Sequence, residues 1–435
     1  MVLKVQPEAG RMWGQLWRAA VLAVAVGLSV ATALITPAGG NPDEAVHVDA
    51  LRWFEHHLLP PPLEQNGLLY SGTGWSRVYT GEAVYSLFGR LGAAWHWLLG
   101  DAPPLLFYRL LNSVLLAVLL VPLLWGSLRT VSLSRTALLV AATPQLIYLF
   151  SYANSDAVAV LAAALLWLAA VWQLESPRLG SWSLLGALVG LVLVTKASAW
   201  PVMAGALGLV AVAWLRHFRA RAWLPLAGVV LLAVMLAAPL RLLPRLVEPG
   251  PWPAGVEAMR AHRAEVRFHP QHPTAAGYHL RQQGVPLSVV ATDVEWWGRT
   301  GMSLWAMYGF MTTRPPLAVL ASAGLLWAAL GGLGVLGLRR ARRDPERDLR
   351  PLAMAGAAVA TLSLSLAASL VHSWVVDYQP QGRYLLPALV PMAMVMAGLE
   401  LPSRVAARVQ TWLLVALAAL GWIVAALLPG QVPNP

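Results

Sequence analysis

The chain has 435 residues, of which 58% are hydrophobic and 12% are charged, whereas an ordinary soluble domain is about one quarter charged. This composition, with a mean hydropathy of +0.61, excludes an ordinary soluble protein and favours a polytopic membrane protein. The net charge of +11 does not indicate a nucleic-acid partner, because arginines in the short loops between apolar runs are typical of membrane topology.

Apolar runs long enough to cross a hydrocarbon core of about 30 Å recur along the chain. Their lengths and periodicity predict an all-α protein with about eleven transmembrane helices. The predicted spans are approximately 17–37, 105–128, 135–152, 156–174, 181–195, 197–215, 222–241, 316–338, 351–371, 384–400 and 410–428. The first run is longer than the apolar core of a signal peptide, so we predict that it is a retained helix.

Arginines in the short loops predict the orientation of the spans. With the N-terminus in the cytoplasm, they fall in alternate, inner loops, as the positive-inside rule requires. They are Arg129, Arg135, Arg178, Arg216, Arg219, Arg221, Arg339, Arg340, Arg342, Arg343, Arg404 and Arg408. We therefore expect the C-terminus and two long loops, 38–104 and 242–315, outside. The predicted organisation is a transmembrane module over 1–241, the second long loop, and C-terminal transmembrane helices over 316–435.

The first long loop contains two amphipathic, aromatic-rich stretches, 45–58 and 82–99. Such stretches are typical of helices that lie in the membrane interface. We therefore predict two juxtamembrane helices in this loop rather than a β-domain.

Two adjacent carboxylates, Asp43 and Glu44, directly follow the first predicted span. An ionisable pair at the membrane surface is costly unless it binds or reacts with something. The same residues also resemble a helix start, with Asn41 as N-cap, Pro42 in the first turn and Glu44 completing a capping box. The two interpretations are compatible, because a helix N-terminus also favours ionised carboxylates.

Other polar residues gather on the same predicted face of the membrane. They are His47, Asn154, Asp156, Lys196, Arg299 and Arg383. Each has a simpler explanation: Asn154 and Asp156 can start a helix, Lys196 can extend to the interface and Arg383 can anchor a span. Independent caps and anchors would scatter over both faces, so their joint placement favours one shared site. His47 lies one helical turn from both acidic residues and is a candidate to share a proton with them.

The sequence predicts no metal centre. Cysteine is absent, so thiolate ligands and disulfides are excluded. Four histidines, His262, His269, His272 and His279, lie in the second long loop. Their spacing matches no standard zinc site, and prolines interrupt them.

Five short motifs resemble the GT-C superfamily of membrane glycosyltransferases and, within it, an uncharacterised bacterial branch of multi-pass proteins. In chain order they are NPDEAVH at 41–47, SYANSDA at 151–157, TKAS at 195–198, SLWAMYGF at 303–310 and QGRYLLP at 381–387. The resemblance covers most of the chain. It implies a GT-C-like fold in the bacterial cytoplasmic membrane, with an extracytoplasmic active site.

The resemblance also implies a reaction. A carboxylate of the first loop, Asp43 by position or else Glu44, acts as general base while a sugar passes with inversion from a polyprenyl-phosphate donor to an acceptor. Lys196, Arg383 and Arg299 are the candidate phosphate ligands, with His47, Asn154 and Asp156 as further substrate-binding candidates. No cofactor is required, although a divalent metal on the acidic pair remains compatible.

The competing hypothesis is a transporter or flippase of lipid-linked sugars. Transporters concentrate charge near the bilayer midplane, whereas the charged residues here are predicted at one surface. Membrane lipid is the other expected partner. The sequence leaves open the sugar, the acceptor (glycan, lipid or protein), the need for a metal, the oligomeric state and the choice of base among Asp43, Glu44 and Asp156.

Overall fold

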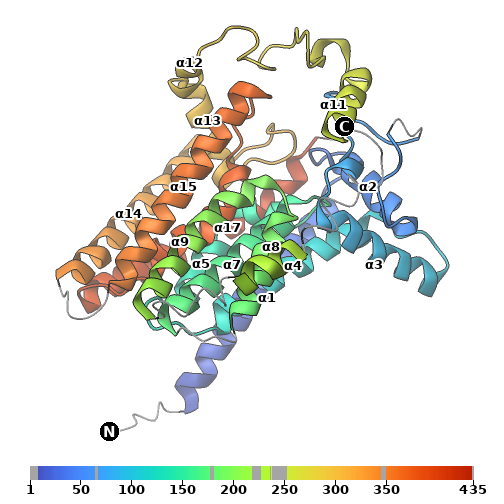
Figure 1. The fold of residues 1–435 in the computed structure, drawn as a ribbon. Helices are drawn as coiled ribbons and strands as arrows, with labels where there is room; N and C mark the ends of the chain where they lie inside the picture. The colour runs from blue at the N-terminus through green and yellow to red at the C-terminus, as the bar shows by residue number, and fades with distance from the viewer. Residues whose placement is uncertain are drawn as a thin grey trace.

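The computed structural model describes residues 8–63, 67–176, 181–217, 227–235, 237, 252–343 and 349–433. Within these residues every regular element is a helix, and pairing of extended segments is limited to three isolated β-bridges. The predicted all-α class is therefore confirmed. Figure 1 shows the long helices packed side by side in one bundle, with α11 and α12 above one end of it.

Seven helices of the described residues are long and apolar enough to cross a membrane. They are α1 (Glu8–Ile35), α4 (Leu105–Trp125), α7 (Asp156–Glu175), α9 (Trp200–His217), α14 (Leu317–Arg343), α15 (Arg350–Val375) and α17 (Arg404–Leu427). Each overlaps a predicted span. Large apolar side chains on their outer surfaces, such as Leu325 and Val359, are exposed. Such a surface is suited to lipid, and the seven helices indicate a multi-pass membrane protein.

One predicted span is divided by a proline. The stretch 135–152 forms α5 (Leu133–Ala141) and α6 (Pro144–Leu149) rather than one continuous helix. Pro144 cannot donate a backbone hydrogen bond, and its ring clashes with the preceding turn, so the first helix ends before it. The prediction of a single helix was wrong here, because an apolar run does not reveal where its backbone hydrogen bonds are broken.

Three more predicted spans are short, irregular or incompletely described. The stretch 384–400 forms η5 (Gly382–Ala388), α16 (Leu389–Ala393) and the π-helical turn η6 (Met394–Gly398), while α8 (Ser181–Leu193) has 13 residues. The predicted span 222–241 lies partly outside the described residues. Within the described residues, three-residue 3₁₀ turns form at η1 (Arg77–Tyr79), η2 (Ala197–Ala199), η4 (Val266–Phe268) and η7 (Pro429–Gln431).

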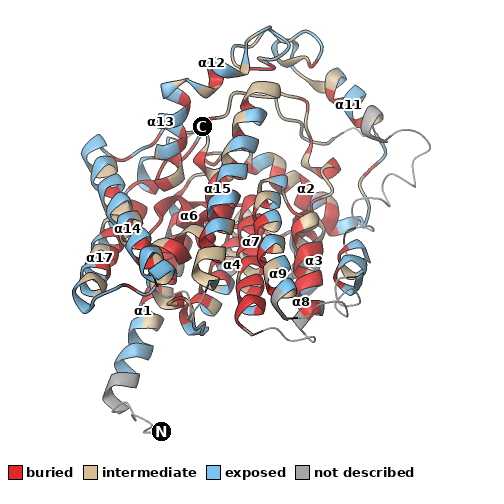
Figure 2. Ribbon diagram, turned by 60° about the vertical axis from the view of Figure 1, so that its left-hand side comes forward, coloured by how far each residue is buried: buried red, intermediate tan, exposed pale blue. Residues whose placement is uncertain are grey.

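Helix α7 lies in the interior of the bundle. Figure 2 shows it buried over most of its length, whereas α1 and α14 are largely exposed. Its sequence is rich in alanine, and small side chains let neighbouring helices approach closely. α4 and α9 both pack against it. The first residue of this buried helix, Asp156, is itself 3% exposed.

The two helices predicted in the first long loop are present as α2 (Glu44–His56) and α3 (Ala83–Leu99). They pack on each other through a small apolar core that includes Leu51, Phe54 and Phe88. Gly89 permits this contact, because a Cβ there would lie 2.7 Å from the backbone carbonyl carbon of Phe54. The core holds α2, and with it the acidic residues at its start, against the bundle.

The second long loop contains α11 (Trp252–Arg263), α12 (Leu287–Ala291) and α13 (Val294–Trp305), which form an arch at one end of the bundle (Figure 2). α11 packs on the first loop, where the Arg260 guanidinium stacks on the Trp75 ring at 4.8 Å and its Nε donates to the Thr73 carbonyl at 3.2 Å. α13 packs against η5. The loop thereby contacts both the N-terminal and the C-terminal parts of the chain.

Candidate functional site

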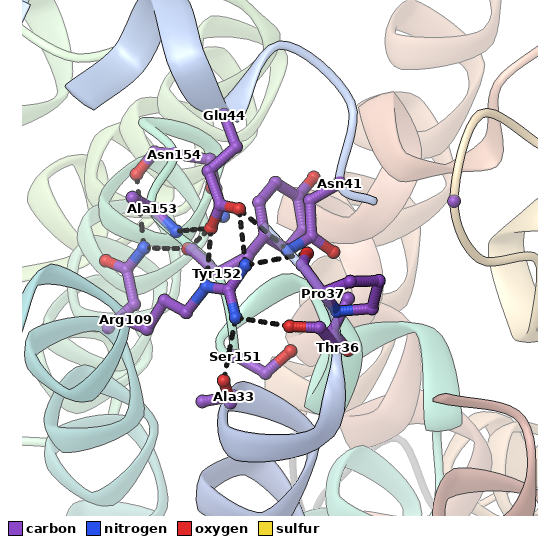
Figure 3. A network of polar contacts seen from close by, with 12 residues as sticks. Ala33, Thr36, Pro37, Asn41, Glu44, Arg109, Ser151, Tyr152, Ala153 and Asn154 are labelled. Atoms are coloured by element: carbon purple, nitrogen blue, oxygen red, sulfur yellow. Dashed lines mark hydrogen bonds and ion pairs between the residues drawn. The ribbon is translucent and has the colours of Figure 1, made fainter. Parts of the chain in front are cut away.

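Glu44 forms a buried, two-pronged ion pair with Arg109 of α4 (Figure 3). The Nε and Nη2 atoms of Arg109 donate to its two carboxylate oxygens at 2.9 and 2.6 Å. One oxygen also accepts from the backbone N–H of Ala153, and the other from the side-chain amide of Asn41, each at 3.1 Å. Glu44 is 2% exposed, so its carboxylate is fully occupied by protein donors.

The remaining N–H groups of Arg109 bond to the C-terminal end of α1. Nη1 donates to the carbonyls of Ala33 and Thr36 at 2.8 and 2.6 Å, and Nη2 donates to that of Pro37 at 3.2 Å. The last carbonyls of a helix have no hydrogen-bond donor within the helix, and Arg109 supplies donors to them. All five of its N–H donors are therefore used, and the network joins the end of α1 to the start of α2.

The capping box predicted at 41–44 is not formed. α2 begins at Glu44, with Asp43 in the N-cap position but without a side-chain capping bond. Asn41 instead accepts a hydrogen bond from the Tyr148 hydroxyl at 2.8 Å and donates to Glu44. The prediction was wrong because long-range partners, Arg109 and Ala153, take the carboxylate that would have bonded to the first turn of the helix.

Asp43 differs from Glu44 in both backbone and surroundings. Its φ of 57° is in the left-handed region, which asparagine and aspartate visit more readily than other non-glycine residues. Its carboxylate is 37% exposed and accepts a hydrogen bond from Arg77 Nη2 at 3.3 Å. Strained backbone tends to occur at functional sites. Of the two adjacent carboxylates, Asp43 is the accessible one.

Asp43 lines a cavity of about 210 Å³. The lining residues come from four parts of the chain, and they are Pro42, Asp43, Gln145, Tyr148, Tyr152, Ser303, Met307, Gly309, Phe310, Met311, Gln379, Gln381 and Arg383. Met311, with φ 61°, is a second non-glycine residue with a left-handed backbone at this wall. The first loop, α6, the end of α13 and the entry to η5 therefore meet at one place.

Arg383 is the cation on the cavity wall. Its guanidinium lies 5.4 Å from the centre of the Tyr384 ring and interacts electrostatically with Asp156 and Asp43. Its Nε is buried and makes no hydrogen bond to any described residue. Arg383 therefore keeps one N–H donor without a protein partner among the described residues.

Asp156 and Lys196 form a second ion pair beside the cavity. Lys196 Nζ lies 2.9 Å from one carboxylate oxygen and 3.0 Å from the other, and it also lies 5.4 Å from the centre of the Tyr384 ring. The same ring thus lies next to both Lys196 and Arg383. Ser155 occupies the N-cap position of α7 without a side-chain capping bond, whereas Asn154, one residue earlier, accepts the Ala157 N–H through its Oδ1 at 2.9 Å.

Arg299 does not belong to this cluster. It pairs with Glu295 one turn away at 2.7 Å, and both side chains are at least half exposed. His269 and His272 stack on each other, and His279 Nδ1 contacts the Val375 carbonyl at 2.8 Å. Among the described residues, no three His, Cys, Asp or Glu side chains are arranged to hold a metal ion.

His47 is buried one turn along α2 from Asp43, where its Nδ1 lies 2.7 Å from the Tyr85 hydroxyl. Burial lowers the pKa of this imidazole well below its ordinary value, and the positive charges of Arg77, Lys196 and Arg383 lower the pKa further. The neutral ring cannot act as a cation at neutral pH. Its position links α2 to α3 rather than placing it on the cavity wall.

Because the pKa of His47 is lower in the folded state, the unfolded chain takes up a proton first as pH falls below about 6.5. We expect stability to decrease from that pH downwards, by up to about 1.4 kcal/mol per pH unit, until the folded-state pKa is reached. Thermal unfolding of detergent-solubilised protein between pH 8 and pH 5 measures this. His47→Asn should flatten the profile, whereas the exposed neighbour His57→Asn should not. Parallel profiles for wild type and His47→Asn would exclude the assignment.

Sequence reasoning missed Arg77 and Arg109. Arg109 had a usable signal, because a lone arginine inside an apolar span is costly and needs a partner. Arg77 and Gln379 had none, since ordinary polar residues in a loop are typical of solvent-exposed surface, whereas Gln381 belongs to the motif at 381–387.

Comparisons with known proteins identify no family: no protein-family model matches the chain, and no curated protein matches it significantly. Membership of the GT-C superfamily therefore stays a prediction from the five motifs.

Proposed function

We propose that this protein is a GT-C-type glycosyltransferase of the bacterial cytoplasmic membrane, with about eleven spans and an extracytoplasmic active site. It transfers a sugar from a polyprenyl-phosphate donor to an acceptor. The observation that carries the proposal is the pairing of an accessible carboxylate, Asp43, with an arginine that keeps an unused donor, Arg383, on the wall of one cavity. A base for the acceptor and a cation for the leaving phosphate are what this reaction needs.

In the proposed reaction Asp43 removes the proton from an acceptor hydroxyl. The oxygen forms a bond to the anomeric carbon while the bond from that carbon to the phosphate oxygen breaks, which inverts the configuration. The electron pair leaves with the polyprenyl phosphate, and Arg383 stabilises its negative charge. Asp43 is a better base candidate than Glu44, because four protein donors already occupy Glu44.

The other candidates take secondary roles in this proposal. Asp156 is bound to Lys196 and holds that cation beside Tyr384, so Lys196 is the second phosphate ligand. Glu44 and Asn154 position the chain around the cavity, and His47 joins α2 to α3. Arg299 has no part in the site, since it is half exposed and paired with Glu295.

The described residues do not fit a divalent metal at the acidic pair. A divalent cation takes several oxygen ligands, but Glu44 is paired with Arg109 and Asp43 with Arg77, so each carboxylate already has a different cation as its partner. No step of the proposed reaction passes through a metal.

The proposal predicts transfer without a nucleotide sugar. Protein purified into liposomes with a polyprenyl-phosphate hexose should release polyprenyl phosphate and glycosylate a supplied acceptor, or slowly hydrolyse the donor. Charge gathered around one cavity at the first loop, rather than distributed at mid-helix positions, supports an enzyme over a transporter. Transbilayer movement of the intact donor without bond cleavage would contradict the proposal and favour the flippase.

A further inference from the structure

Two side-chain atoms at the cavity have unused hydrogen-bonding capacity. Gln381 Oε1 and Arg383 Nε are both buried without a hydrogen bond to a described residue, and both residues line the cavity. A buried acceptor without a partner costs free energy. The last torsion of a glutamine side chain is broad, so rotation about it can bring Oε1 toward a donor inside the cavity.

Several other polar groups of the wall already have protein partners. The Tyr148 hydroxyl donates to Asn41 and accepts from the Gly309 N–H, and the Gln379 amide donates to Asp377 and accepts from the Tyr384 hydroxyl. Ser303 Oγ accepts from the Gly382 N–H and donates to the Arg299 carbonyl. Gln381 and Arg383, with Asp43 on the same wall, are therefore the candidates to recognise a ligand.

We propose that Gln381 determines specificity by accepting a hydrogen bond from a hydroxyl of one uncharged sugar unit held in the cavity. This inference rests on the proposed function and names the class of sugar. Gln381 is two residues from Arg383, so a sugar against Gln381 has its phosphate near the guanidinium. Apart from Asp43 and Arg383, the residues that line the cavity are neutral, so a charge on the sugar in addition to the phosphate has no further charged partner there.

The volume of the cavity supports the binding of a single sugar unit. Sites for drug-sized ligands hold about 300–1,000 Å³, whereas this cavity holds about 210 Å³. One sugar ring is suited to that space. The polyprenyl chain then lies outside the cavity, among the apolar helices.

The test compares three proteins, wild type and two variants, on five donors. Gln381→Met keeps the length of the side chain and removes the acceptor, and Gln271→Met is the matched control on an exposed loop position. The donors are a polyprenyl-phosphate hexose and its deoxy analogues at each of four hydroxyls. For the full hexose, Gln381→Met should lower kcat/KM by about tenfold or more. With one of the deoxy donors, the kcat/KM of wild type should fall by a similar factor. Gln381→Met should use that deoxy donor and the full hexose with equal kcat/KM.

A second measurement separates this inference from the proposed function. Binding of water-soluble methyl hexopyranosides and of a methyl glucuronide is followed by isothermal titration calorimetry. Weaker binding of hexoside to Gln381→Met, without any transfer by wild type, would support the sugar site and overturn the transferase. Transfer with equal kcat/KM for wild type and Gln381→Met on every donor would overturn the sugar contact alone. Preference for the glucuronide would overturn the assignment of an uncharged sugar.

Discussion

Asp43→Asn is expected to remove nearly all sugar transfer while the fold and the binding of the donor survive. Asparagine also tolerates the left-handed backbone found at position 43 and can still accept the hydrogen bond from Arg77. It cannot take a proton from an acceptor hydroxyl. A general base contributes typically about 10²–10⁴-fold to the rate, so kcat should decrease by that factor. Initial rates of donor cleavage, with donor affinity measured in parallel, provide the test.

The matched control for that substitution is Asp49→Asn on the same helix. Asp49 accepts the Leu69 N–H at 3.0 Å and does not line the cavity, and asparagine retains an acceptor there. Its turnover should stay close to wild type. Full turnover by Asp43→Asn would remove Asp43 from the mechanism and make Asp156 the next base to test.

Arg109→Ala is expected to cause the largest loss of stability. The substitution leaves the Glu44 carboxylate buried without its cation. It also removes the N–H groups that donate to the carbonyls at the end of α1. Removing one member of a buried ion pair typically costs about 3–5 kcal/mol. Unfolding of purified protein by heat or by denaturing detergent should show a large decrease in the midpoint. The acidic pair should also become misplaced, so activity should fall with stability.

Two variants establish that this effect belongs to the network. Arg109→Lys keeps the charge but loses the planar, two-pronged geometry, so its midpoint should lie between those of wild type and Arg109→Ala. Arg90→Ala removes an exposed arginine from α3 and should change stability by no more than about 0.5 kcal/mol. If Arg109→Ala were as stable as Arg90→Ala, Arg109 would not organise the start of α2.

The helices themselves could be predicted from the sequence because apolar length and periodicity are local properties. α2 and α3 appeared where amphipathic patterns placed them, and the seven long helices overlap predicted spans. Pro144 was visible in the sequence, but the surrounding residues are so uniformly apolar that the run predicted one continuous helix. Local patterns therefore located the helices more reliably than their interruptions.

The candidate site was only partly predictable. Asp156 pairs with Lys196, and Asp43 lines one cavity together with Arg383; that these residues act as one site stays a prediction. The different environments of Asp43 and Glu44 could not be read from two adjacent acidic residues. They depend on a positive φ at Asp43 and on Arg109, which lies 65 positions farther along the chain. Only the folded chain reveals which carboxylate remains accessible.

The central claim is that the cavity beside Asp43 binds the reacting end of a lipid-linked sugar. A cryo-electron microscopy structure of the Asp43→Asn variant in nanodiscs, with a polyprenyl-phosphate hexose bound, tests it most directly. The account predicts the phosphate against Arg383, the sugar against Gln381 and the anomeric carbon facing position 43. Donor density elsewhere, such as a phosphate at the arginines that end α14, with the cavity occupied only by water, would contradict it.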